Sequence, residues 1–214
     1  MDEDLSIINA NTRNEKIKNF FVNNKSKLIS GIIILIILLI AVFSYDKYLI
    51  NKKREISDKF NSIIINYTDN KKEKTFSSLI EIINKKDPTY SPLSLYFIID
   101  NNLSSDQNKI NLLFDTLIED ASLDQEIRNL IIYKKALYNA DDAQESDLLN
   151  MLNPLINSKS VWKSHSLYLM AEYFYANNQK QKAKEFFNQI LILDNLNPDI
   201  RLQAEKRLNR DLSD

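Results

Sequence analysis

Glycine and cysteine are almost absent from this chain of 214 residues, which has one glycine and no cysteine. Average usage would give about 15 glycines in this length. Phosphate-cradling loops, dinucleotide fingerprints and nucleophile elbows all need backbone conformations that glycine supplies, so these sites are excluded. The lack of cysteine excludes thiolate catalysis, disulfides, thiol-ligated zinc and attachment of lipid to cysteine.

Histidine is nearly as scarce, because His165 is the single one. A metal site built from several histidines of one chain is therefore impossible, and we expect no metal and no cofactor. The net charge is −1, from 28 basic and 29 acidic residues, with no long basic block. Nucleic acid is accordingly not an expected partner, and no small-molecule substrate is expected. We predict that the protein is not an enzyme, with no catalytic residues.

One apolar run, residues 28–45, dominates what is present. Its centre, residues 32–43, holds twelve consecutive uncharged residues, almost all of them large aliphatics. Eighteen residues of helix rise roughly 27 Å, close to the bilayer's hydrocarbon thickness of about 30 Å. We therefore predict a single transmembrane helix over residues 28–48, preceded by a short tail, residues 1–27. The residues expected to anchor it in the lipid bilayer are Leu28, Ile32, Leu35, Leu38, Leu39, Phe43 and Tyr45.

Two alternatives to an anchor are a cleaved signal peptide and a buried core helix. A signal peptide would need an unusually long n-region of 27 residues, and Val42-Phe43-Ser44 matches a cleavage site only marginally. A buried helix fits poorly, because the run has no polar face. Basic residues are equally numerous on both sides, so charge leaves the orientation undecided. The first dozen residues are polar and are expected to lack regular structure.

Residues 49–214 have the pattern of helices arranged as repeated hairpins. Caps and periodicity predict helix starts near residues 55, 74, 90, 106, 124, 145, 160, 180 and 197. Alternate starts lie about 35 residues apart, close to the 34-residue period of tetratricopeptide repeats. The predicted fold is all-α, with one N-terminal transmembrane helix followed by a tetratricopeptide-like helical-hairpin solenoid. A generic helical bundle is the alternative.

The clearest repeat lies within residues 161–196, and a capping helix is expected at 197–212. Small residues would let the paired helices approach, and large ones would fill the space beside them. Asn177-Asn178 would replace glycine in the turn, because asparagine tolerates the left-handed conformation. Asn197 and Pro198 suit the start of the last helix. The residues expected to pack the repeats are Tyr96, Tyr133, Leu167, Tyr168, Ala171, Phe174, Ala183 and Phe187.

This layout resembles a bacterial inner-membrane tetratricopeptide family, the ancillary subunit of the SecYEG translocon. The resemblance rests on the short basic tail, the single span, a helix running on from it through Arg54-Glu55-Ile56, and the late repeat LYLMAEYFYANNQKQKAKEFFNQIL. It is weakest over residues 55–120. It implies a cytoplasmic N-terminus, a periplasmic repeat domain, and protein partners: the Sec translocon, periplasmic chaperones and client proteins.

Three other functions stay open beside an accessory translocon subunit. The first is an anchored scaffold of cell-division or envelope-assembly machinery. The second is a carboxylate-dependent enzyme, which would require several carboxylates in one pocket. The third is a cytoplasmic domain with an exported tail. Individual residues favour structural roles: His165 and Trp162 suit repeat junctions, and the acidic residues near Glu145 suit a helix start. Partner-binding residues cannot be assigned from the sequence.

Overall fold

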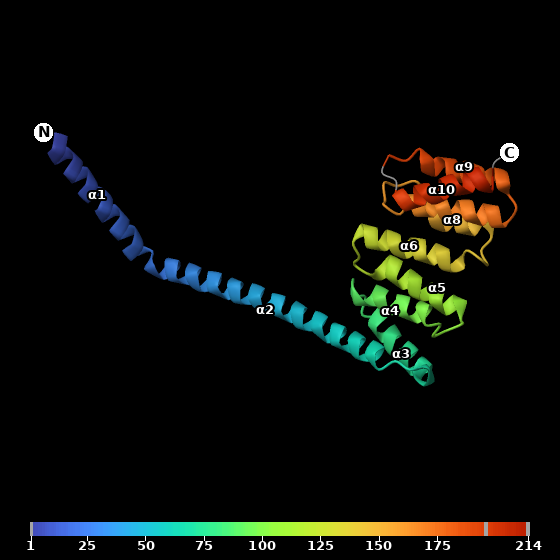
Figure 1. The fold of residues 1–214 in the computed structure, drawn as a ribbon. Helices are drawn as coiled ribbons and strands as arrows, with labels where there is room; N and C mark the ends of the chain where they lie inside the picture. Colours follow the sequence, from blue (N-terminus) through green and yellow to red (C-terminus); the bar gives the residue numbers. More distant parts are fainter. Residues whose placement is uncertain (1, 195–196, 213–214) are drawn as a thin grey trace. The chain divides into compact units, whose positions relative to one another are not determined.

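The computed structural model describes residues 2–194 and 197–212, and every regular element in these ranges is helical. Figure 1 shows the elements in chain order. The α-helices are α1 (Asp2–Asn23), α2 (Lys25–Ile65), α3 (Lys72–Ile83), α4 (Tyr90–Asp100), α5 (Gln107–Asp115), α6 (Gln125–Asn139), α7 (Glu145–Ile156), α8 (Lys163–Ala176), α9 (Lys180–Leu191) and α10 (Pro198–Arg210). A short 3-10 helix, η1 (Asp69–Lys71), precedes α3, and a π-helical turn, η2 (Thr116–Asp120), follows α5. The chain divides into two compact units, which meet between Glu55 and Ile56.

The first unit consists of α1 and most of α2. The prediction that the first dozen residues lack regular structure is wrong, because α1 is helical from Asp2. The stretch contains neither glycine nor proline, so nothing in it interrupts a helix.

Helix α2 runs on past the apolar run, in agreement with the continuous helix expected from the resemblance, and is one element of 41 residues. The separate helix start predicted near residue 55 is therefore wrong. Between residues 46 and 65 no glycine or proline breaks the chain. Gly31 lies within the helix, and a Cβ atom added there would meet no other group within 4 Å.

The second unit holds a helical domain in which helices adjacent in sequence pack against each other. These contacts run in order from α3 to α10, and α8 additionally contacts α6 and α10. The later helices α8, α9 and α10 lie side by side in Figure 1. Starts predicted for α3 to α10 are confirmed to within three residues.

Two clusters of buried side chains form the core of this domain. The first extends from Ile56 in α2 to Ile131 in α6, and the second from Ala136 in α6 to Leu212. Helix α6 contributes to both, so it joins the two clusters. In α9 the buried residues Ala183, Phe187 and Ile190 are three or four positions apart, which places them on one helical face.

Turns and caps close the helices without glycine. Among the described residues, three have a positive φ: Lys86, Asn102 and Asn178, at 55°, 48° and 59°. The left-handed turn predicted at Asn177-Asn178 is therefore confirmed at Asn178. The predicted cap is also confirmed, because the Asn197 side chain accepts from the backbone N–H groups of Asp199 and Ile200, with Pro198 in the first turn.

Candidate functional site

The apolar run lies in α2 with its side chains outside any core. Of the predicted anchor residues, Leu28 is half-buried and the other six are exposed, as are the aliphatic residues between them. Within the described ranges, α2 is the single helix that is long and apolar enough to cross a membrane. Exposed apolar side chains occur all around this part of the helix, so the described residues of its own unit do not bury the run.

In the helical domain, two clefts open along α4, α6 and α8. The first, of about 180 Å³, lies between α4 and α6 with Phe114 of α5 at its base; Asp100, Lys134 and Leu137 are among the residues that line it. The second, of about 340 Å³, lies between α8 and the turn that follows α6, and Asp141, Glu172 and Tyr173 are among its lining residues. Both clefts reach the C-terminal ends of these helices and combine apolar walls with charged side chains, a mixture suited to binding a polypeptide.

Tyr96 forms one wall of the α4–α6 cleft. The Lys134 ammonium of α6 lies 4.7 Å from the centre of its ring, a cation–π contact that links the two helices. Among the described buried side chains, the Tyr96 hydroxyl is the one polar group without a hydrogen-bond partner. Burial raises the pKa of Tyr96 to about 12, so the phenol stays neutral at physiological pH.

Tyr133 occupies the junction between α6 and α8. Its ring stacks on Trp162 at 5.8 Å and meets the edge of His165 at the same distance. The Trp162 indole donates to the backbone carbonyl of Glu126 at 3.2 Å, while the Glu126 carboxylate accepts from Ser160. Desolvation lowers the pKa of His165, so its imidazole is neutral at pH 7. The Ser164 hydroxyl lies 3.5 Å from Nδ1 of the imidazole. The aromatic contacts and hydrogen bonds of these residues hold the junction between the two helices together.

Tyr168 lies two helices further along, in α8, and packs edge-on against Phe187 of α9 at 5.5 Å. Burial and the neighbouring Glu172 raise its pKa to about 12. The remaining predicted packing residues of this hairpin, Leu167, Ala171, Phe174 and Ala183, are all buried. Thus the three tyrosines of the predicted set face α6, α8 and α9 respectively, each joining its helix to a later one.

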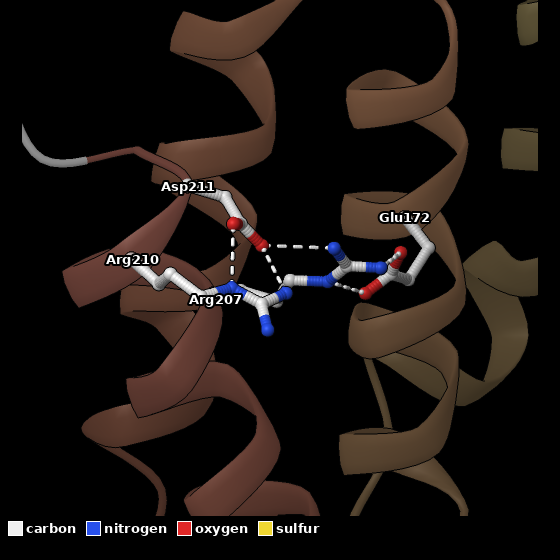
Figure 2. Close-up of polar contacts among 4 residues, drawn as sticks. All are labelled: Glu172, Arg207, Arg210 and Asp211. Atoms are coloured by element: carbon white, nitrogen blue, oxygen red, sulfur yellow. Dashed lines mark hydrogen bonds and ion pairs between the residues drawn. The ribbon is translucent and has the colours of Figure 1, made fainter.

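A network of charged side chains ties α8 to α10 (Figure 2). Arg207 donates to both carboxylate oxygens of Glu172, through Nε and Nη2, at 2.7 Å each. It also donates from Nη1 to Asp211 at 2.9 Å, and Arg210 holds the same aspartate from the other side. Hydrogen bonds from Arg210 and Arg207 hold the pKa of Asp211 well below its usual range. The bidentate geometry fixes the last helix against the preceding hairpin.

Sequence reasoning missed this network, although a signal exists. Glu172 is the one acidic residue in the otherwise apolar and aromatic stretch from Leu167 to Ala176, so a basic partner on a neighbouring helix should have been sought. The small buried residues of α4 were missed as well. Ser91 and Ser94 take the place of alanine there, and their hydroxyls donate to the carbonyls of Ile82 and Tyr90.

Acidic side chains do not gather in one place in the described part of the chain, where no group of three could hold a metal ion. Glu145, considered above as part of an acidic cluster, is bound by Lys182 at 2.7 Å and also accepts from Gln179. These contacts hold the pKa of Glu145 below its ordinary value. Its role is to join α7 to α9.

No family model, curated protein or solved structure gives a significant match to this chain.

Proposed function

We propose that this protein is a membrane-anchored scaffold for protein–protein interaction, an accessory component of the Sec translocon that links exported proteins to periplasmic chaperones. One observation carries the proposal: the apolar run of α2 is exposed on every side, yet its helix continues into a packed helical domain. A bilayer would cover the first part, and the second would remain free for partners.

The helical domain is proposed to be a tetratricopeptide-like solenoid. Support comes from the sequential packing of α3 to α10 and from the hairpin of α8 and α9. In that hairpin, Ala171 and Ala183 are fully buried beside the large rings of Phe174 and Phe187, as the repeat pattern requires. Helix α10, bound by the Glu172–Arg207 pair, would close the stack as a terminal cap.

The proposed partner surface is the row of clefts along α4, α6 and α8. In a solenoid the first helices of successive hairpins share one side of the stack, which presents an extended surface to a bound segment. Asp100 and Lys134 in one cleft, and Asp141 in the other, provide polar groups beside the apolar walls. A partner would be expected to place an apolar side chain into a cleft and its charges at the rim.

The proposed topology has a cytoplasmic N-terminus and a periplasmic helical domain in the bacterial inner membrane. The experiment that tests it is protease digestion of a C-terminal tag in spheroplasts, with intact inner membranes as control. Digestion from outside is expected. Protection of the tag until the membrane is dissolved would place the domain in the cytoplasm and contradict the translocon role.

The partner is tested by site-specific photo-crosslinking in living cells. A benzoyl-phenylalanine at Leu137, 48% exposed at the rim of the α4–α6 cleft, is expected to capture translocon subunits or periplasmic chaperones. The matched control is the same group at Ile192, which is 81% exposed after α9 and lines neither cleft. Capture of cell-division or envelope-assembly proteins at Leu137, with no translocon component, would instead favour a scaffold of that machinery.

A further inference from the structure

A separate polar cleft lies between the last turns of α2 and the start of α3. Its volume is about 220 Å³, and its lining consists of Ser62, Ile63, Asn66, Lys71, Lys74, Thr75 and Ser78. Every one of these side chains except Ile63 can donate a hydrogen bond, and the lining includes no carboxylate. The cleft therefore concentrates donors and positive charge in one concave place.

The spacing of these residues explains why they converge. Ser62 lies in the last turn of α2, and Asn66, directly after the helix end, donates from its side-chain amide to the Ser62 carbonyl at 2.8 Å. Lys71 is the last residue of η1, directly before α3, and Lys74 and Ser78 are four residues apart on one face of α3. The hairpin itself thus builds the cleft.

Thr75 is the most informative residue of the cleft. Thr75 is buried, with 6% of its surface exposed. Its hydroxyl nevertheless makes no hydrogen bond to a described residue. Among described buried polar atoms, only the Tyr96 hydroxyl is both sealed from solvent and unpartnered, so the Thr75 hydroxyl must reach solvent. The cleft that Thr75 lines provides that access.

Hydroxyls at helical positions usually bond to the carbonyl four residues earlier. Ser77, two residues along the same helix, does so to Glu73 at 3.0 Å. The Thr75 hydroxyl makes no such bond, so its O–H group remains free to donate to a molecule in the cleft.

The two lysines of the cleft are equally uncommitted. Neither Lys71 nor Lys74 makes an ion pair with a described residue, whereas the intervening Lys72 lies 3.9 Å from Asp69. Two unneutralised ammonium groups beside the same opening repel each other, and an anion between them would relieve this repulsion.

We propose that this cleft binds a phosphoryl-type oxyanion. A tetrahedral phosphate offers several acceptor oxygens, enough for both ammonium groups and for the hydroxyls of Thr75 and Ser78, whereas a planar carboxylate offers only two oxygens. Lysine is a common phosphate ligand in proteins. The source is either a phospholipid headgroup or a soluble phosphate compound, which share this chemistry. The proposal is independent of the scaffold function.

Binding is tested by calorimetric titration of the full chain, in nanodiscs of zwitterionic lipid, with inorganic phosphate at constant ionic strength. K71Q/K74Q is expected to abolish binding. T75V, which preserves shape and breaks no hydrogen bond of the protein, is expected to weaken binding about tenfold. The control K159Q/K180Q removes the same charge from exposed lysines outside the cleft and is expected to bind like the wild type. Circular dichroism verifies that each variant is folded.

The source is distinguished by a photo-crosslinker at Asn66, on the rim, in nanodiscs containing radiolabelled phosphatidylglycerol. A labelled adduct that is lost in K71Q/K74Q supports a lipid headgroup as the ligand. Phosphate binding without an adduct supports a soluble compound. The proposal is overturned if neither phosphate binding nor an adduct is observed. It is also overturned if T75V binds as well as the wild type while both lysine pairs weaken binding equally, because binding would then reflect surface charge alone.

Discussion

Isoleucine occurs in opposite environments in the two units of this chain. Ile32, Ile33 and Ile34 in the apolar run of α2 are between 51% and 59% exposed, whereas Ile82 and Ile83 of α3 have no exposed surface. The side chains are identical, so residue type alone does not determine whether they are buried or exposed. What differs is the pattern, because apolar residues surround the first helix and occupy only one stripe of the second. A stripe can be buried by neighbouring helices of the same chain, whereas an apolar surface on every side needs an apolar solvent.

The largest effect is expected when two charges are introduced into the apolar run of α2, because they would remove the difference between its surroundings and those of the helical domain. L35R/L38R places two arginines at the centre of the span, at about 2.5–3.5 kcal/mol each, which adds to roughly 5–7 kcal/mol against insertion. The variant is expected to leave the membrane fraction in density-gradient flotation, which separates inserted protein from aggregates. L35V/L38V, which stays apolar, is the control. Flotation of the arginine variant with the membranes would mean that this run is not held by lipid.

The second-largest effect is expected from a substitution in the second core cluster, which should destabilise the helical domain and leave membrane binding unchanged. F187A removes a fully buried ring of α9 and is expected to lower the free energy of unfolding by about 3–5 kcal/mol. Chemical denaturation of the detergent-solubilised chain measures this, while flotation should be unchanged. I192A alters an exposed residue next to the same helix and is expected to change stability by less than about 0.5 kcal/mol. Equal losses in both variants would show that Phe187 is not a core residue.

A smaller effect is expected at the turn between α8 and α9, outside both apolar environments. Asn178 has a φ of 59°, and the next residue, Gln179, donates from its backbone N–H to Phe174 at 2.8 Å. N178A should cost about 1 kcal/mol, because alanine resists the left-handed region, whereas N178G should be neutral or stabilising. Thermal melting of both variants gives the comparison, and a melting point for N178A above that of N178G would contradict this account.

The smallest effect is a dependence on pH at the end of α10. The arginines lower the pKa of Asp211 in the folded state, so the ion pairs add stability above the ordinary aspartate pKa of about 4. This contribution is lost as the pH falls through the lower folded-state value. The difference in melting temperature between wild type and D211N should therefore shrink from pH 7 to pH 3. D58N, which removes an exposed aspartate without an ion pair to a described residue, is the matched control.

Much of this fold was predictable because its signals are local. Helix starts, the turn at Asn178 and the cap at Asn197 each depend on a few adjacent residues. The continuity of α2 agrees with the helix running on through Arg54-Glu55-Ile56 that the resemblance implies. The separate helix start predicted near residue 55 is wrong, because a helix needs no break where its environment changes. Contacts between residues distant in the sequence were the hardest to predict. Nothing adjacent to Glu172 in the sequence indicates that Arg207 binds it. The clefts were not predicted either, because each one combines residues from two or three separate segments of the chain.

The sequential packing of α3 to α10 has a consequence for how the domain acquires its structure. Nearly every helix finds its main neighbour immediately before or after it in the chain, so few contacts must wait for distant segments. Chains with mostly local contacts fold fast, since little loop entropy is lost before contacts form. Folding can accordingly begin at α3 while later helices are still being synthesised. The Arg207–Glu172 pair then forms last and completes the domain when its final helix arrives.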